Sequence, residues 1–107
     1  MVNSEVPQEI KEKYRKGRKF VCEYAGKTVA HGIVEDYVFV THEEYITGVE
    51  KLKIEEDGRT EFRFMYWANK GKGWKWGLFC VKLPQDKLQE LFNEMVKKRW
   101  INKESTP

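Results

Sequence analysis

The sequence predicts an α+β fold: a twisted antiparallel β-sheet of five or six strands, with a short N-terminal helix and a C-terminal amphipathic helix packed on one face. Apolar and polar residues alternate over several short segments before Pro84, turn-forming residues separate these segments, and a helical periodicity follows Pro84. The 107 residues are 40% hydrophobic and 14% aromatic, which suffices for a packed core. We therefore expect a single domain over residues 1–107, with flexible ends at residues 1–6 and 102–107.

The first predicted element is a short helix over residues 7–16. Pro7 suits a first helical turn, and Ile10 and Tyr14 are four positions apart in a largely charged segment. Gly17 is expected to end this helix.

Alternation of apolar and polar side chains predicts the strands that follow. Asp57-Gly58 is a strong hairpin signal, because glycine adopts the positive φ that the turn requires. Residues 69–73 contain two glycines and two lysines, and they predict a mobile basic loop between two antiparallel strands. The strands are expected at residues 18–25, 28–35, 37–41, 45–56, 60–68 and 74–83.

The C-terminal helix has the clearest pattern in the chain. Pro84 suits its first turn, and apolar residues from Leu88 to Trp100 recur at i, i+3, i+4, i+7, i+8 and i+12. Acids lie in its first two turns and Lys97, Lys98 and Arg99 near its end, as the helix dipole favours. We expect its apolar side to pack on the sheet.

Charge is distributed unevenly along the chain. The 20 Lys and Arg exceed the 17 Asp and Glu by three, and basic residues gather in segments 11–19, 69–82 and 97–104. Nine acids lie between Glu35 and Glu61, which predicts an electrically two-sided molecule. No apolar run approaches the ~20 residues that cross a bilayer, and the first residues lead us to expect no secretory leader. We expect no membrane partner and a cytoplasmic location.

The sequence contains no recognisable catalytic or metal-binding motif. His31, Cys22 and the run His42-Glu43-Glu44 lack the ligand spacing of known metal sites. We therefore expect no enzymatic activity, no metal and no cofactor. Cys22 and Cys80 are far apart in apolar surroundings, and we expect two buried thiols.

The most distinctive segment combines aromatic rings with cations. It runs from Phe62 to Trp67, through the basic loop 69–73, to Trp74-Lys75-Trp76. Lysine and arginine bind the phosphates of a single strand, and flat rings stack on its unpaired bases for about 1–3 kcal/mol per base. The combination predicts a nucleic-acid-binding hairpin.

Alternation divides the aromatic residues of this segment between two faces. Trp67 shares a face with Glu61 and Arg63, and a sheet with one helix leaves that face uncovered. We therefore expect exposed tryptophans, which stack on a ligand or form a subunit interface. The residues expected to form core against the C-terminal helix are Phe62, Phe64, Tyr66, Leu78 and Phe79.

A second line of inference comes from the order of motifs between Lys51 and Val96. A hairpin with a basic turn leads into a helix whose start is marked by Leu83 and Pro84. The basic turn contains Lys70, Lys72 and Lys75, and the following strand begins with Trp74 and Trp76. This order resembles the single-stranded DNA-binding domains of the transcriptional-coactivator and Whirly superfamily, although the Ser or Asn that precedes the proline in those domains is missing. The resemblance implies single-stranded DNA binding and dimerisation.

The sequence thus predicts non-catalytic binding of single-stranded nucleic acid, DNA or RNA, by a chain that forms homo-oligomers. The alternative is a small homo-oligomeric interaction module whose exposed tryptophans form the subunit interface. The residues expected to contact nucleic acid are Lys11, Lys13, Arg15, Lys16, Arg18, Lys19, Arg63, Trp67, Lys70, Lys72, Trp74, Lys75 and Trp76.

Overall fold

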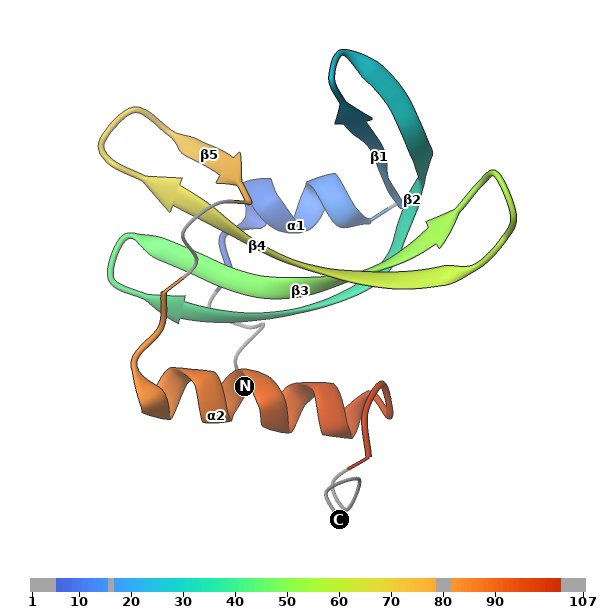
Figure 1. Ribbon diagram of the computed structural model, residues 1–107. Coiled ribbons are helices and arrows are strands. Elements are labelled where there is room, and N and C mark those ends of the chain that lie inside the picture. The colour runs from blue at the N-terminus through green and yellow to red at the C-terminus, as the bar shows by residue number, and fades with distance from the viewer. Residues whose placement is uncertain (1–5, 16, 79–81, 103–107) are drawn as a thin grey trace.

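The computed structural model describes residues 6–15, 17–78 and 82–102. Within them, two helices flank five strands in an α+β architecture (Figure 1). The strands form one antiparallel sheet in sequence order, β1-β2-β3-β4-β5, which confirms the predicted fold class. The elements are α1 (Gln8–Tyr14), β1 (Arg18–Tyr24), β2 (Lys27–His42), β3 (Tyr45–Ile54), β4 (Thr60–Asn69), β5 (Trp74–Gly77) and α2 (Gln85–Lys97).

Short turns with left-handed residues join the strands. Ala25 and Gly26 connect β1 to β2 with φ angles of 54° and 78°, a pair of positive values that matches the twist of a two-residue hairpin. Between β3 and β4, Gly58 has a φ of 74°, and the Arg59 N–H donates a hydrogen bond to Asp57 Oδ1 at 3.0 Å. The Asp57-Gly58 turn predicted from the sequence is therefore confirmed.

The second strand is one continuous element, so the prediction of separate strands at 28–35 and 37–41 is wrong. Val34 pairs with Leu52 and Asp36 pairs with Lys51, which leaves one extra residue in β2, a β-bulge. The bulge reverses the alternation, because Val34 belongs to the core beside α1 whereas Val38 belongs to the core beside α2. This break in the pattern resembles the end of one strand and the start of another.

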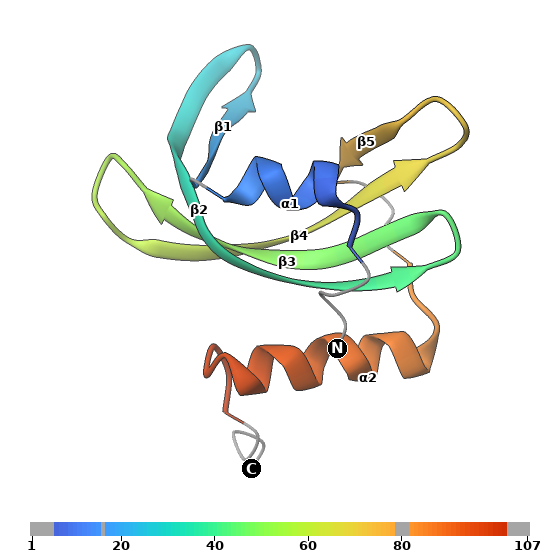
Figure 2. The same cartoon turned by 180° about the vertical axis from the view of Figure 1, so that it is seen from behind.

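The sheet is strongly curled, and each of its faces packs against a helix (Figures 1 and 2). On the concave face, Ile10 and Tyr14 of α1 enter a core that contains Phe39 and Met65. On the convex face, Leu91 of α2 enters a smaller core whose other buried members are Val38, Val40 and Val49. The expectation that one face is uncovered is therefore wrong, because α1 fills the concavity.

A glycine on β3 allows the concave core to close. Gly48 pairs with Phe39 across the strands, and a Cβ at residue 48 would collide with the Phe39 ring. The ring therefore lies over the glycine, where its centroid is 5.4 Å from that of Tyr14 and 4.8 Å from that of Tyr37. This aromatic cluster fixes α1 against the sheet.

The C-terminal helix covers β2 and β3 but leaves much of β4 open, which corrects the predicted core. Phe62, Phe64 and Leu78 are 43%, 52% and 42% exposed, and Tyr66 is half-buried, while Phe79 lies outside the described residues. Lys98 Nζ is 3.1 Å from Asp36 Oδ1, which ties the end of α2 to the bulge in β2.

The cysteines and the helix lengths bear on two earlier expectations, buried thiols and the absence of a membrane span. Cys22 is exposed, so the prediction that it is a buried thiol is wrong, and Cys80 lies outside the described residues. The longest described helix has 13 residues, and none in the described part of the chain is long and apolar enough to cross a membrane.

Candidate nucleic-acid interface

The β4–β5 hairpin is built from a regular register and a glycine-rich loop. Asn69 pairs with Trp74, and the loop between them contains Gly71 and Gly73 with φ angles of 95° and 90°. The Gly71 N–H donates a hydrogen bond to Asn69 Oδ1 at 2.9 Å, so the asparagine side chain holds the turn from within. The loop predicted at residues 69–73 therefore lies between two antiparallel strands, as expected.

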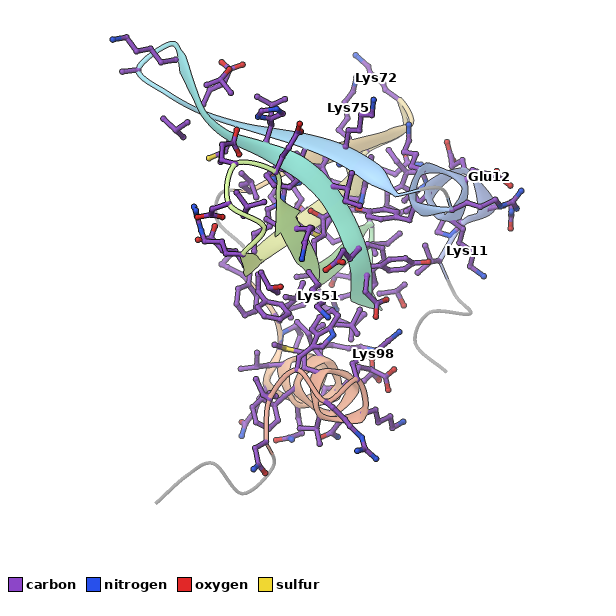
Figure 3. All side chains as sticks on the ribbon, turned by 90° about the vertical axis from the view of Figure 1, so that its right-hand side faces the viewer. Lys11, Glu12, Lys51, Lys72, Lys75 and Lys98 are labelled. Atoms are coloured by element: carbon purple, nitrogen blue, oxygen red, sulfur yellow. The ribbon has the colours of Figure 1, made fainter. Side chains whose placement is uncertain are left out.

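This hairpin forms a pocket of about 280 Å³ whose lining residues include three lysines and no acid. The predicted site residues Lys70, Lys72 and Lys75 all line it, so the structure brings these three together. In Figure 3, Lys72 and Lys75 project at the same end of the molecule. The lining residues are Tyr66, Ala68, Lys70, Lys72, Gly73, Lys75 and Trp76.

Two tyrosines that sequence reasoning did not assign to the site lie beside these lysines. The centroid of the Tyr45 ring is 6.1 Å from that of Tyr66, in an edge-to-face arrangement, and Lys70 Nζ lies 5.8 Å from the Tyr45 centroid. Tyr66 pairs with Gly77, and a Cβ at residue 77 would lie only 2.5 Å from Tyr66 Cζ. The signal in the sequence is a glycine directly opposite an aromatic residue in a hairpin.

Trp67 lies inside the protein, which corrects its predicted role as a stacking residue. It is 3% exposed, and its Nε1 donates a hydrogen bond to the Tyr14 hydroxyl at 3.2 Å. Trp74 and Trp76 are half-buried and pack against the same concave core. Trp76 Nε1 is itself buried and has no hydrogen-bond partner within the described residues. The tryptophans therefore support the hairpin more than they line its outer surface.

Arg18 and Arg63 flank the Trp76 ring. Their Cζ atoms lie 5.1 Å and 4.6 Å from its centroid, within the range of a cation–π interaction. Arg63 Nε also donates to Glu50 Oε1 at 2.7 Å, and the Arg63 side chain is only 16% exposed. The charge of Arg63 is thus neutralised inside the protein, and its predicted contact with phosphate is not favoured by this position.

The Glu50 carboxylate is fully buried and links three elements. One oxygen accepts the Arg63 bond, and the other accepts a hydrogen bond from the Tyr14 hydroxyl. The pKa of Tyr14 is raised far above its ordinary value of 10.0. Burial is the main cause, and the negative charge of Glu50 is the second. This network joins α1, β3 and β4 beneath the hairpin.

Arg18 of the N-terminal basic segment lies against Trp76, a pocket-lining residue, whereas Lys11 on α1 lies apart from the pocket. Arg15 pairs with Glu12 at 2.6 Å, and Lys13 Nζ lies 5.8 Å from the Trp67 ring centroid on the concave side. Lys11 lies on α1, well separated from Lys72 and Lys75 in Figure 3. Lys19 is exposed on β1, and Lys16 lies outside the described residues.

Acidic side chains gather at the opposite end of β4. Glu55 and Glu56 both lie against His31, with Glu55 Oε2 3.0 Å from His31 Nε2. The pKa of Glu56 lies below its ordinary value of 4.5, and the main cause is the hydrogen bond that its carboxylate accepts from the His31 backbone N–H. Tyr66, the first pocket residue on β4, is six residues beyond Thr60, so about 20 Å of strand lies between the start of β4 and the basic pocket. The nearer acids Glu43 and Glu44 occupy the adjacent β2–β3 turn and do not line the pocket.

Comparison with protein-family models, with curated proteins and with solved structures gave no match for this chain. Within the described residues, no group of three or more His, Cys, Asp or Glu side chains is placed to hold a metal ion. The chemistry of the hairpin is therefore the basis for a functional proposal.

Proposed function

We propose that this protein binds single-stranded nucleic acid, without catalysis, through the β4–β5 hairpin. The observation that carries the proposal is the pocket in which Lys70, Lys72 and Lys75 gather beside Tyr66 with no acid among the lining residues. A polyanion gains favourable charge contacts there, and a base can rest on an aromatic ring. The resemblance of residues 51–96 to the transcriptional-coactivator and Whirly superfamily supports the same proposal.

The proposed mechanism divides the work between two kinds of side chain. The lysine ammonium groups neutralise phosphates and release counterions, which makes the affinity depend steeply on salt. Tyr66 provides the stacking surface in place of Trp67, because its ring lines the pocket. Cation–π contacts beneath the hairpin hold β4 and β5 in place; they join Arg18 to Trp67 and Trp76, and Arg63 to Trp76.

The proposal is tested by fluorescence anisotropy of a short labelled single strand, at low and moderate salt, with a duplex of the same sequence for comparison. The Lys72→Ala/Lys75→Ala variant is expected to bind the strand at least tenfold more weakly. The matched control is Lys27→Ala/Lys53→Ala, which removes the same charge from two exposed lysines outside the pocket. Equal affinities of the two double variants would refute the proposal.

A second candidate is a homo-oligomeric interaction module, favoured by one specific observation. Exposed apolar side chains lie near α2, on the convex side of β4 and on the outer flank of the helix. The Phe62 ring contacts the Trp100 ring, with centroids 5.1 Å apart. These exposed side chains, rather than the tryptophans, are the candidates for a subunit interface. They are Phe62, Phe64, Leu78, Leu88 and Phe92, each between 42% and 54% exposed.

The second candidate predicts a mass above that of one chain. Light scattering of the purified protein is expected to give at least twice the monomer mass of 12.8 kDa, and Phe64→Lys is expected to restore the monomer. A monomeric mass for the unsubstituted protein over the whole concentration range would remove this candidate. The nucleic-acid proposal does not depend on the outcome, because Phe64 lies outside the pocket.

A further inference from the structure

The pocket concentrates more positive charge than a single internal phosphate of a strand requires. Three lysines contribute to it from one hairpin, and Ala68, with its small side chain, and Gly73, with none, also line it. A bridging phosphate diester carries one negative charge, whereas a terminal phosphomonoester carries about 1.5 to 2 at neutral pH. The excess of ammonium groups therefore favours a doubly charged group over a singly charged one.

The size of the pocket points to one nucleotide unit. Its volume of about 280 Å³ is just below the range of roughly 300–1,000 Å³ that is common for small-ligand sites. An extended strand of several nucleotides needs a continuous groove with repeated cations along it. Here Lys11 of α1 lies well apart from Lys72 and Lys75 (Figure 3), so these three cations do not follow one groove.

From charge and size together, we propose that the pocket binds the phosphorylated end of a nucleic-acid strand, with the terminal base against Tyr66. This inference deepens the proposed function and rests on it. Lys70, Lys72 and Lys75 contact the terminal phosphate, and Gly73 lets the backbone of the loop approach it closely. The rest of the strand adds weaker, nonspecific contacts outside the pocket.

The test uses one sequence in three forms: a 5′-phosphate, a 3′-phosphate or hydroxyl groups at both ends, each with an internal fluorescent label. The full chain is expected to bind one of the phosphorylated strands at least fivefold more tightly than the hydroxyl-ended strand. Lys72→Ala/Lys75→Ala should abolish this preference, and Lys27→Ala/Lys53→Ala should retain it. The preference should also shrink as the pH falls below about 6, where the phosphomonoester loses its second charge.

The outcomes separate this inference from the proposed function. Equal affinity for the three strands, with strand binding still dependent on Lys72 and Lys75, overturns end recognition and leaves the proposed function intact. If the unsubstituted protein binds none of the three strands, both end recognition and the proposed function are overturned. Inorganic phosphate and a nucleoside monophosphate serve as competitors, because each carries a phosphate group like that of the phosphorylated strand end. Displacement of the strand by an equal concentration of nucleoside monophosphate would assign the pocket to free nucleotides and overturn end recognition.

Discussion

The ring of Tyr66 lies across Gly77, its partner on the neighbouring strand, where any side chain would collide with it. The contact places a tyrosine as one wall of the basic pocket. It also explains why β5 contains a glycine in an otherwise aromatic segment, Trp74-Lys75-Trp76-Gly77. The position of the stacking residue therefore depends on the absence of a Cβ one strand away.

Gly77→Ala is the first predicted perturbation. The new methyl group should displace the Tyr66 ring and weaken single-strand binding by a factor of about 5 or more, equivalent to roughly 1 kcal/mol of stacking. Anisotropy titration measures the loss, and thermal unfolding verifies that the variant is folded. Tyr66→Phe is the control, because it retains the ring. If Gly77→Ala binds the strand as tightly as the unsubstituted protein, Tyr66 is not the stacking residue.

The second prediction concerns the buried ion pair beneath the hairpin. Arg63→Met leaves the Glu50 carboxylate buried without its cation, and it should lower the free energy of unfolding by about 3–5 kcal/mol. The double variant Glu50→Gln/Arg63→Met should lose clearly less, because it buries no charge. Urea denaturation measures both. A double variant less stable than Arg63→Met alone would show that the charge pair is not the source of the loss.

Alkaline stability provides a third prediction, from the raised pKa of Tyr14. The folded state suppresses ionisation of this hydroxyl, so its contribution to stability is complete below the unfolded pKa of about 10 and is lost as the pH rises above it. Tyr14→Phe should be less stable at pH 8, since Glu50 and Trp67 lose a hydrogen-bond partner, but should decline less between pH 9 and 11. Parallel alkaline declines in urea midpoints would contradict the account.

The acidic end of β4 yields the fourth prediction. The depressed pKa of Glu56 means that its stabilising contribution is present above the unfolded pKa near 4.5 and is lost as the pH falls through the lower folded value. Glu56→Gln should therefore reduce stability at pH 7 and have little effect at pH 2. His31→Asn should retain most of the acid dependence, because the backbone N–H of residue 31 is the main cause of the shift. Chemical denaturation at several pH values measures these effects, and a His31→Asn profile identical to that of Glu56→Gln would refute this assignment.

The sequence was sufficient to predict local elements whose signal lies in neighbouring residues. The periodicity after Pro84 predicted α2, and the spacing of Ile10 and Tyr14 predicted α1. The loop at residues 69–73 was predicted from its glycines, and its lysines meet in one pocket. Each of these signals depends on short-range geometry, which a single sequence contains.

The errors arose where a long-range arrangement decides the outcome. Alternation correctly placed Trp67 on the face opposite Phe62, but it could not show which face a helix covers. The concavity that receives α1 exists only once the five strands have curled, and a helix of seven residues with two buried side chains gives little sign of it. For the same reason, Tyr45 was not predicted beside Lys70, because β3 brings it there across the sheet.

The central claim is that the lysines of the β4–β5 hairpin neutralise phosphates of a bound single strand. Its most direct test is the slope of log affinity against log salt concentration for the unsubstituted protein and for Lys72→Ala/Lys75→Ala. Each phosphate contact on a single strand contributes about 0.7 to this slope, so the variant should be shallower by about 1.4. Lys27→Ala/Lys53→Ala should leave the slope unchanged. An unchanged slope in the hairpin variant would contradict the claim.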